Sequence, residues 1–165
     1  MRALTALLAP LALALALAGC GFSPMYAAPG HGQGPAIGAV DIGEIEGKAG
    51  HTLRTELDRL LSIESGQGPV QHLDITLREE VVPLGLRLDE SASRAELRLR
   101  ADYVFAPTGG REMRGSVLTV VSYEIPLAAF AAIAAQDDAR ERAAETLAER
   151  MRSELALRLA QSRRS

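Results

Sequence analysis

Residues 94–105 alternate between polar and apolar side chains, with Val104 as the one exception. The odd positions are apolar or aromatic: Ala95, Leu97, Leu99, Ala101, Tyr103 and Phe105. The even positions are charged as far as 102: Arg94, Glu96, Arg98, Arg100 and Asp102. Because successive side chains of a β-strand point to opposite faces, this pattern predicts a strand with one buried face and one face in water. Such a strand requires a sheet that is covered on one side, which limits what the other segments can form.

Two segments before this strand also predict strands. Residues 36–46 alternate loosely, and residues 70–81 alternate clearly, with Leu73, Ile75 and Leu77 on one side. Residues 83–93 then favour a turn-rich connection.

One more strand is predicted after the alternating strand 94–105. The run Pro107-Thr108-Gly109-Gly110 predicts a hairpin turn, and residues 112–125 predict the return strand. Leu118 and Val120 lie on the second face of this strand, so we expect it to be covered on both sides and to be central.

Two segments change to a helical period. Within residues 48–63 one apolar stripe recurs at helical spacing: Leu53, Leu57, Leu60 and Leu61. Residues 136–161 predict a long helix whose apolar positions advance by four: Ala139, Ala143, Leu147, Met151, Leu155 and Leu159. The intervening residues 127–135 carry no charge. We expect Phe130 and Ile133 to be buried somewhere, and nine residues are too few to span a bilayer.

The order of these elements indicates the fold class. A strand, a helix, three strands and a long helix predict an α+β fold in β-α-β-β-β-α order. Two helices would pack on one face of a four-stranded, mostly antiparallel sheet. Residues 36–165 are long enough for this single domain.

The first nineteen residues have the plan of an export signal. Met1-Arg2 is positively charged, and residues 3–18 are uncharged and consist mainly of leucine and alanine. As a helix, residues 3–18 would span about 24 Å, short of the bilayer core of about 30 Å. A secretory signal peptide is therefore favoured over a permanent membrane span. Cys20, the only cysteine, follows it directly and has no partner for an intramolecular disulfide.

The stretch Leu17-Ala18-Gly19-Cys20 resembles the lipobox of bacterial lipoproteins. This resemblance implies that residues 1–19 are removed and that Cys20 is acylated and becomes the first residue of the mature chain. Residues 20–35, rich in glycine and proline, would then form a lipidated tether. Gly21 favours the outer membrane, because an aspartate there would indicate retention in the inner membrane. Ordinary cleavage that leaves Cys20 as a free thiol is the alternative.

Together with the lipobox, Gly21-Phe22-Ser23-Pro24-Met25-Tyr26 resembles the start of mature LptE-family lipoproteins of the alphaproteobacterial type, although Met25 stands where leucine is expected. Ser122-Tyr123 and residues 137–142 resemble the same family. The resemblance implies a lipid-anchored protein on the periplasmic side of the outer membrane. It would plug and support assembly of the LptD β-barrel and bind lipopolysaccharide in transit to the cell surface. The alternative is an accessory lipoprotein of another envelope lipid-transport or efflux complex.

The sequence holds no pattern typical of catalysis or metal binding. His31, His51 and His72 share no metal-ligand spacing, and no G-x-S-x-G motif is present. We therefore expect no enzymatic activity, no metal and no cofactor. Loss of Arg2 with the signal changes the net charge from −3 to −4, which disfavours nucleic acid as a partner.

One group of residues is a candidate binding site. Arg94, Arg98 and Arg100 share the polar face of one predicted strand, and Arg114 has matching parity on its partner. Guanidinium groups bind phosphates and carboxylates through two hydrogen bonds at once. Our hypothesis is that this face contacts lipid A phosphates or the barrel wall. The alternative is a solvated face with Glu96 and Asp102 between the arginines.

Overall fold

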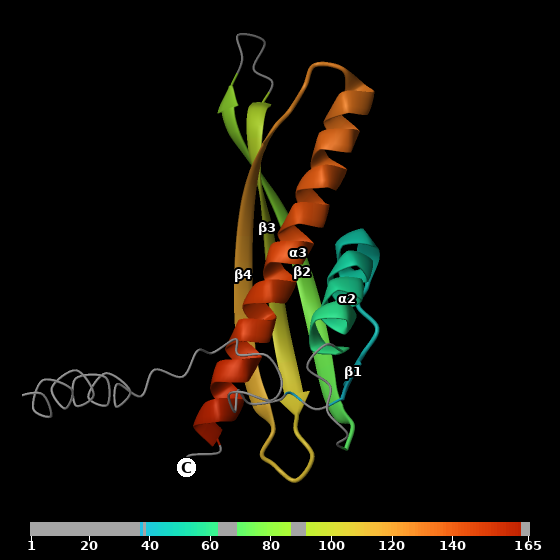
Figure 1. The fold of residues 1–165 in the computed structure, drawn as a ribbon. Helices are drawn as coiled ribbons and strands as arrows, with labels where there is room; N and C mark the ends of the chain where they lie inside the picture. The colour runs from blue at the N-terminus through green and yellow to red at the C-terminus, as the bar shows by residue number, and fades with distance from the viewer. Residues whose placement is uncertain (1–36, 38, 63–68, 87–91, 163–165) are drawn as a thin grey trace, which may run out of the picture. The chain divides into compact units, whose positions relative to one another are not determined.

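The computed structural model describes residues 37, 39–62, 69–86 and 92–162. The predicted signal peptide 1–19, Cys20 and the tether 20–35 lie outside these residues. Six elements follow one another: β1 (Val40–Ile42), α2 (Gly47–Ser62), β2 (Gln71–Leu86), β3 (Ala92–Ala106), β4 (Met113–Glu124) and α3 (Ala129–Ser162). The predicted α+β class and its β-α-β-β-β-α order are confirmed (Figure 1).

The sheet has the order β1-β2-β3-β4. The short β1 pairs in parallel with the start of β2, and the other neighbours are antiparallel. Both helices lie on one face of the sheet, α3 against β3 and β4 and α2 beside α3 and β1 (Figure 1). The odd-numbered side chains of β3 are buried beneath them, as the alternation predicts. The opposite face has no covering layer among the described residues.

Strand β4 lies at an edge of the sheet, so the expectation of a central strand is wrong. Its second face is open to solvent, with Leu118 47% and Val120 45% exposed. The physical reason is that both helices cover the same face, and β3 already has β2 as its other neighbour. Two arginines of α3 donate hydrogen bonds to carbonyl oxygens on this edge: Arg150 Nη1 to Leu118 O at 2.7 Å and Arg158 Nη1 to Arg114 O at 3.1 Å.

The hairpin between β2 and β3 is longer than the sequence indicates. Composition predicts a turn from position 83, but β2 continues to Leu86 and β3 begins at Ala92. Pro83 is tolerated because β1 pairs only with Gln71–Leu73, so β2 has a free edge at Pro83, where no backbone donor is needed.

Helix α3 begins at Ala129, seven residues before the predicted start. Its first buried residue is Ala139. The earlier apolar side chains project into solvent, with Leu127 80%, Phe130 89% and Ile133 59% exposed. The expectation that Phe130 and Ile133 are buried is therefore wrong, because the stripe of α3 that faces the sheet starts only beyond them.

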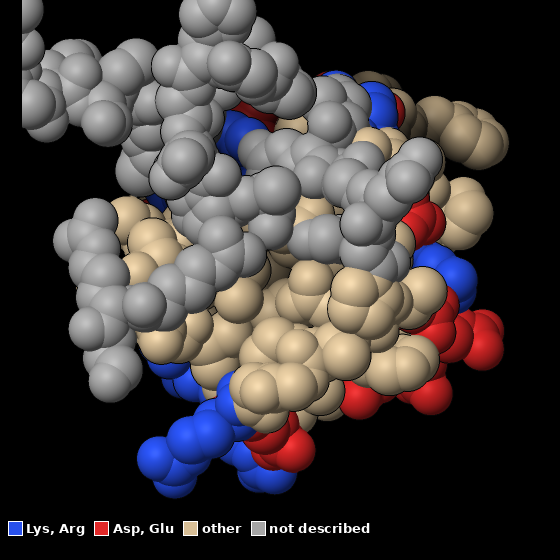
Figure 2. Space-filling model, turned by 60° about the horizontal axis from the view of Figure 1, so that its bottom comes forward, with Lys and Arg blue, Asp and Glu red and all other residues tan. Residues whose placement is uncertain are grey.

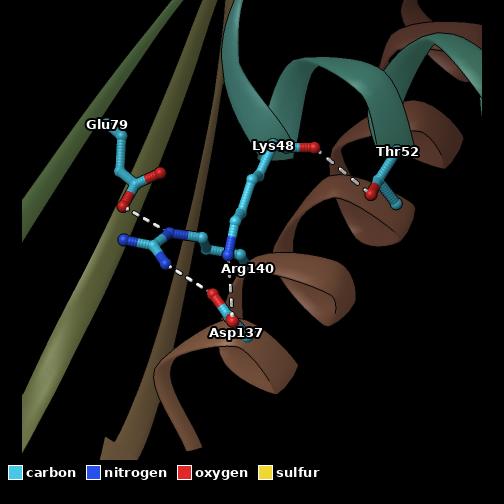
Figure 3. A network of polar contacts seen from close by, with 5 residues as sticks. All are labelled: Lys48, Thr52, Glu79, Asp137 and Arg140. Carbon is cyan, nitrogen blue, oxygen red and sulfur yellow. Dashed lines mark hydrogen bonds and ion pairs between the residues drawn. The ribbon is translucent and has the colours of Figure 1, made fainter. Parts of the chain in front are cut away.

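A network of ion pairs connects α3 to α2 and β2 near Asp137, just after the exposed start of α3 (Figure 3). Asp137 contacts Lys48 at 3.2 Å and Arg140 at 2.7 Å, and Arg140 Nε donates to Glu79 Oε1 at 2.8 Å. Hydrogen bonds from Lys48 and Arg140 lower the pKa of Asp137. The network joins α2, α3 and β2 on the covered side of the sheet.

Tyr103 of β3 lies across Gly115 of β4 in the buried layer. Its hydroxyl donates to Glu154 Oε1 at 2.9 Å, and burial together with this carboxylate raises the pKa of Tyr103 to about 12. A Cβ atom at position 115 would overlap the Tyr103 hydroxyl. Only glycine therefore fits beside this ring.

Thr119 of β4 is only 1% exposed, and its hydroxyl has no hydrogen-bond partner among the described residues. Replacing it by valine removes a buried, unsatisfied polar group and keeps the side-chain shape. Thr119→Val is expected to raise the free energy of unfolding by about 1 kcal/mol, measured by urea denaturation. Thr76→Val, at an exposed position of β2, should leave it nearly unchanged. A loss of stability in Thr119→Val would contradict this prediction.

Candidate functional site

The open face of the sheet carries all four predicted arginines. Arg94, Arg98 and Arg100 project from β3, and Arg114 projects from β4 opposite Val104. Each is at an even position, whereas the odd positions of these strands face the helices. The common face expected from parity is therefore observed.

These arginines form a row rather than one cluster. Arg98 and Arg100 are neighbours on the face, and Arg94 lies four residues to one side of Arg98. Arg114 lies across from Val104, four residues to the other side of Arg100. At about 3.3 Å per residue the row extends over about 33 Å. Only Arg98 and Arg100 are close enough to act on one small group.

A fifth arginine lies on the same face, beside the centre of this row. Arg78 of β2 lies directly opposite Arg100. Its polar position in the alternation of β2 is visible in the sequence, but its place beside Arg100 depends on the register of the hairpin. Reasoning from the sequence alone therefore misses it as a site residue.

Asp102 lies between these two arginines and neutralises part of their charge. Arg100 Nε is 3.3 Å from Asp102 Oδ1, and Arg78 Nη2 is 3.7 Å from Asp102 Oδ2. A hydrogen bond from Ser116, and then the two arginines, lower the pKa of Asp102. This carboxylate is therefore ionised at neutral pH and occupies guanidinium donors that an anionic ligand would need.

Most of the other arginines also have acidic neighbours. Arg98 contacts Glu96 at 3.1 Å and Glu80 at 3.8 Å, and Arg114 contacts Glu112 at 2.7 Å. Five acidic side chains of β2, β3 and β4 share the face with the five arginines: Asp74, Glu80, Glu96, Asp102 and Glu124. Asp41 of β1 and Glu112 before β4 add two more. The face is thus a mixed-charge network of exposed ion pairs, as the alternative of a solvated face expects. An incoming anion would have to exchange places with these carboxylates.

Arg94 differs from the rest of the row. It forms no ion pair with any residue in the described part of the chain. It lines a shallow hollow of about 400 Å³ between the end of β4 and α3, together with Tyr123 and Arg142. Arg142 is held by Asp138 at 2.8 Å, so Arg94 is the cation in this hollow whose charge is least compensated.

Aliphatic side chains lie between the charged groups of the open face. Val120 lies opposite Arg98, Leu118 lies opposite Arg100, and Leu84 lies opposite Arg94. All three are between 38% and 47% exposed. The face therefore offers guanidinium donors and apolar contacts side by side, which suits an amphiphilic anion or a polar protein wall with apolar patches.

The end of the domain that holds the β3–β4 turn does not present a cluster of cations among the residues drawn in colour (Figure 2). Figure 2 views the end that holds the β3–β4 turn, where the centre is uncharged and charged side chains of both signs lie mainly at the margin. The described residues contain no group of histidine, cysteine and acidic side chains that could hold a metal ion. No described helix is long and apolar enough to cross a bilayer.

The fold has counterparts among solved structures. No family model and no curated protein matches the chain. A protein of Caulobacter crescentus CB15 named as a lipoprotein is 34% identical, with a TM-score of 0.58 over 74% of this chain and 90% of that chain. A minor lipoprotein of Acinetobacter baumannii is 16% identical, with a TM-score of 0.56 over 73% and 91%. A weaker likeness is to rare lipoprotein B of Shewanella oneidensis, 19% identical with a TM-score of 0.49 over 73% and 97%.

Proposed function

Because the chain belongs to the same family as the Caulobacter crescentus lipoprotein, we propose that it is an LptE-type lipopolysaccharide-assembly lipoprotein. It is anchored through acylated Cys20 on the periplasmic side of the outer membrane and has no enzymatic activity. The lipobox at 17–20 and the string Gly21–Tyr26 support this assignment, as does the observed order of helices and strands.

The proposed partner is an LptD-type β-barrel that the domain plugs and helps to assemble. A wide barrel encloses a polar, water-accessible lumen. The open face of this domain is exposed, carries charges of both signs and is built mainly from β2, β3 and β4. Its arginines and carboxylates can exchange their ion pairs with polar groups of a barrel wall at little cost, because surface ion pairs contribute only about 0–1 kcal/mol each.

The proposed ligand is lipopolysaccharide. The observation that carries this proposal is the alternation of arginines with aliphatic side chains on the open face, centred on Arg98 and Arg100 beside Val120 and Leu118. Lipid A combines phosphate groups with acyl chains, and guanidinium groups bind phosphate through paired hydrogen bonds. Arg94, which has no ion pair with a described residue, adds a donor that no carboxylate in the described part of the chain occupies.

Affinity purification from detergent-solubilised membranes tests the partner. Recovery of a large outer-membrane β-barrel with the tagged protein would support the proposal. Recovery of an inner-membrane ABC assembly instead would indicate an accessory lipoprotein of another envelope transport complex, and would overturn the proposed partner.

Charge reversal of Arg98 and Arg100 tests the ligand. The Arg98→Glu/Arg100→Glu variant is expected to bind purified lipopolysaccharide roughly tenfold more weakly, because it removes two charge-assisted donors and adds two repulsive charges. Arg54→Glu/Arg59→Glu is the matched control, since both arginines are exposed and ion-paired but lie on α2. Circular dichroism checks that both variants are folded. Equal affinities in the two variants would remove the open face as the binding site.

A further inference from the structure

The connection from β4 into α3 ends in an exposed apolar segment, residues 127–135, here called the apolar tip. From Ile125 to Gln136 there is no charged side chain. Phe130 is 89% exposed, Leu127 80% and Ile133 59%. Exposed apolar patches of this kind on a protein surface mark sites of contact with another protein or with a membrane.

The exposed part of the helix is wider than one stripe. Residues 129, 130, 131, 133 and 134 are all exposed and cover about 200° of the circumference of the first turns of α3, and Ala132 and Ala135 on the remaining side are half-buried. A helix that docks in a groove of another protein presents one apolar stripe and keeps a polar back. The apolar tip has no polar side chain on any side, and its exposed arc is about twice as wide as such a stripe, which suits lipid chains better than a protein groove.

The charges that follow set how deep the tip can enter. Asp137 and Asp138 are the first charged residues of α3, and Asp137 is fixed by Lys48 and Arg140. Residues 129–136 measure about 12 Å along the helix axis. This is close to the depth of about 5–10 Å at which interfacial helices lie and far below the thickness of about 30 Å that a spanning helix needs.

The tip lies at the end of the domain opposite to the start of the fold. Strand β1 pairs with Gln71–Leu73, whereas Arg94 pairs with Glu124 just before the tip. The two ends are visible at the bottom and the top of Figure 1. From Leu73 to Leu84, strand β2 covers about 36 Å. Residues 21–36 can span at most about 55 Å, so a chain held at Cys20 can bring the tip to the same membrane.

We propose that the apolar tip inserts into the interfacial layer of a phospholipid bilayer and forms a second membrane attachment beside the lipid anchor. The argument from reach rests on the lipidation of Cys20 in the proposed function, whereas the insertion itself requires neither the β-barrel nor lipopolysaccharide. Phe130 and Ile133 enter the acyl boundary, and the ion pairs of Asp137 remain in water.

The chain contains no tryptophan, which permits a direct test. Phe130→Trp places a single fluorophore at the tip of the full-length protein, and Leu157→Trp places one at a half-exposed position farther along α3. Both are mixed with vesicles of phosphatidylethanolamine and phosphatidylglycerol that contain brominated chains and no lipopolysaccharide. The emission of Trp at 130 is expected to shift to shorter wavelength and to be quenched, while that at 157 changes little. Unchanged emission at 130 would overturn the proposal.

A second measurement separates the tip from the lipid anchor. In a Cys20→Ser chain produced without residues 1–19, Phe130→Ser/Ile133→Ser is expected to reduce vesicle co-sedimentation roughly tenfold or more, because two apolar side chains that would enter the acyl boundary are lost. Leu157→Ser is the control and should have no such effect. Equal sedimentation of the two variants would contradict insertion. If Phe130→Ser/Ile133→Ser instead abolished recovery of the barrel while Trp at 130 stayed in water, the tip would be a protein contact and the proposal would be wrong. Neither result would remove the proposed function.

Discussion

Replacing Cys20 with serine, in a chain whose residues 1–19 are exchanged for a signal peptide that is cleaved without lipidation, is expected to move nearly all of the protein from the membrane fraction to the soluble periplasmic fraction. Serine cannot carry the thioether-linked lipid. Each buried methylene contributes about 0.8 kcal/mol to membrane attachment, so removal of several acyl chains eliminates most of the free energy that holds the protein at the membrane. The remaining contact through Phe130 and Ile133 would be weak and reversible. Cell fractionation followed by immunoblotting measures the shift.

Mass spectrometry of the native protein provides the complementary measurement. The mature chain is expected to begin at Cys20 and to exceed its peptide mass by that of the attached acyl groups. Ser23→Ala is the matched control, because it alters a neighbouring small polar residue without touching the thiol. An unmodified Cys20, or release of the wild-type protein by osmotic shock, would contradict the lipid anchor.

Gly115→Val is expected to destabilise the domain by about 3 kcal/mol and to lower its melting temperature by roughly 10 °C. The new side chain would overlap the ring of Tyr103, with a Cβ only 2.7 Å from Cε1. The ring cannot yield easily, because it is 2% exposed and its hydroxyl is bonded to Glu154. Thermal denaturation followed by circular dichroism measures the loss.

A control variant and a double variant test whether the overlap with Tyr103 causes the loss of stability. Ser122→Val, at an exposed position of the same strand, should change stability by less than about 0.5 kcal/mol, because it meets no buried ring. Combining Gly115→Val with Tyr103→Leu should cost less than the sum of the two single changes, since the smaller side chain vacates the contested space. Additive losses would show that the overlap is not the reason.

The parts of the fold that can be predicted are those encoded in local periodicity. The alternation of 94–105 identifies the strand whose apolar face is buried, and the leucines of α2 and the apolar stripe from Ala139 onward identify the helical faces. Each of these patterns can be recognised within a single helix or strand, without knowing how the elements pack together. They also place Arg94, Arg98 and Arg100 on one face, because these arginines share one strand. Arg114 joins them because the apolar odd positions of its own strand must face the same core.

The errors arise where packing between elements decides the outcome. Leu118 and Val120 indicate a strand covered on both sides, but nothing in β4 itself records that both helices lie on the other face. Phe130 and Ile133 are expected to be buried because they are apolar, yet burial depends on where α3 meets the sheet. The pairing of Arg78 with Arg100 and of Gly115 with Tyr103 requires the strand register, which the sequence pattern does not fix.

The two arginine hydrogen bonds to the outer carbonyls of β4 have a consequence for how this protein behaves in a crowded envelope. A free strand edge is a template on which a second chain can extend the sheet, and long edges of this kind promote aggregation. Here a foreign strand would first have to displace Arg150 from Leu118 and Arg158 from Arg114. Each such charge-assisted bond is worth about 1.5–3 kcal/mol. Helix α3, which covers the core, thereby also protects part of the β4 edge from pairing with a strand of another chain.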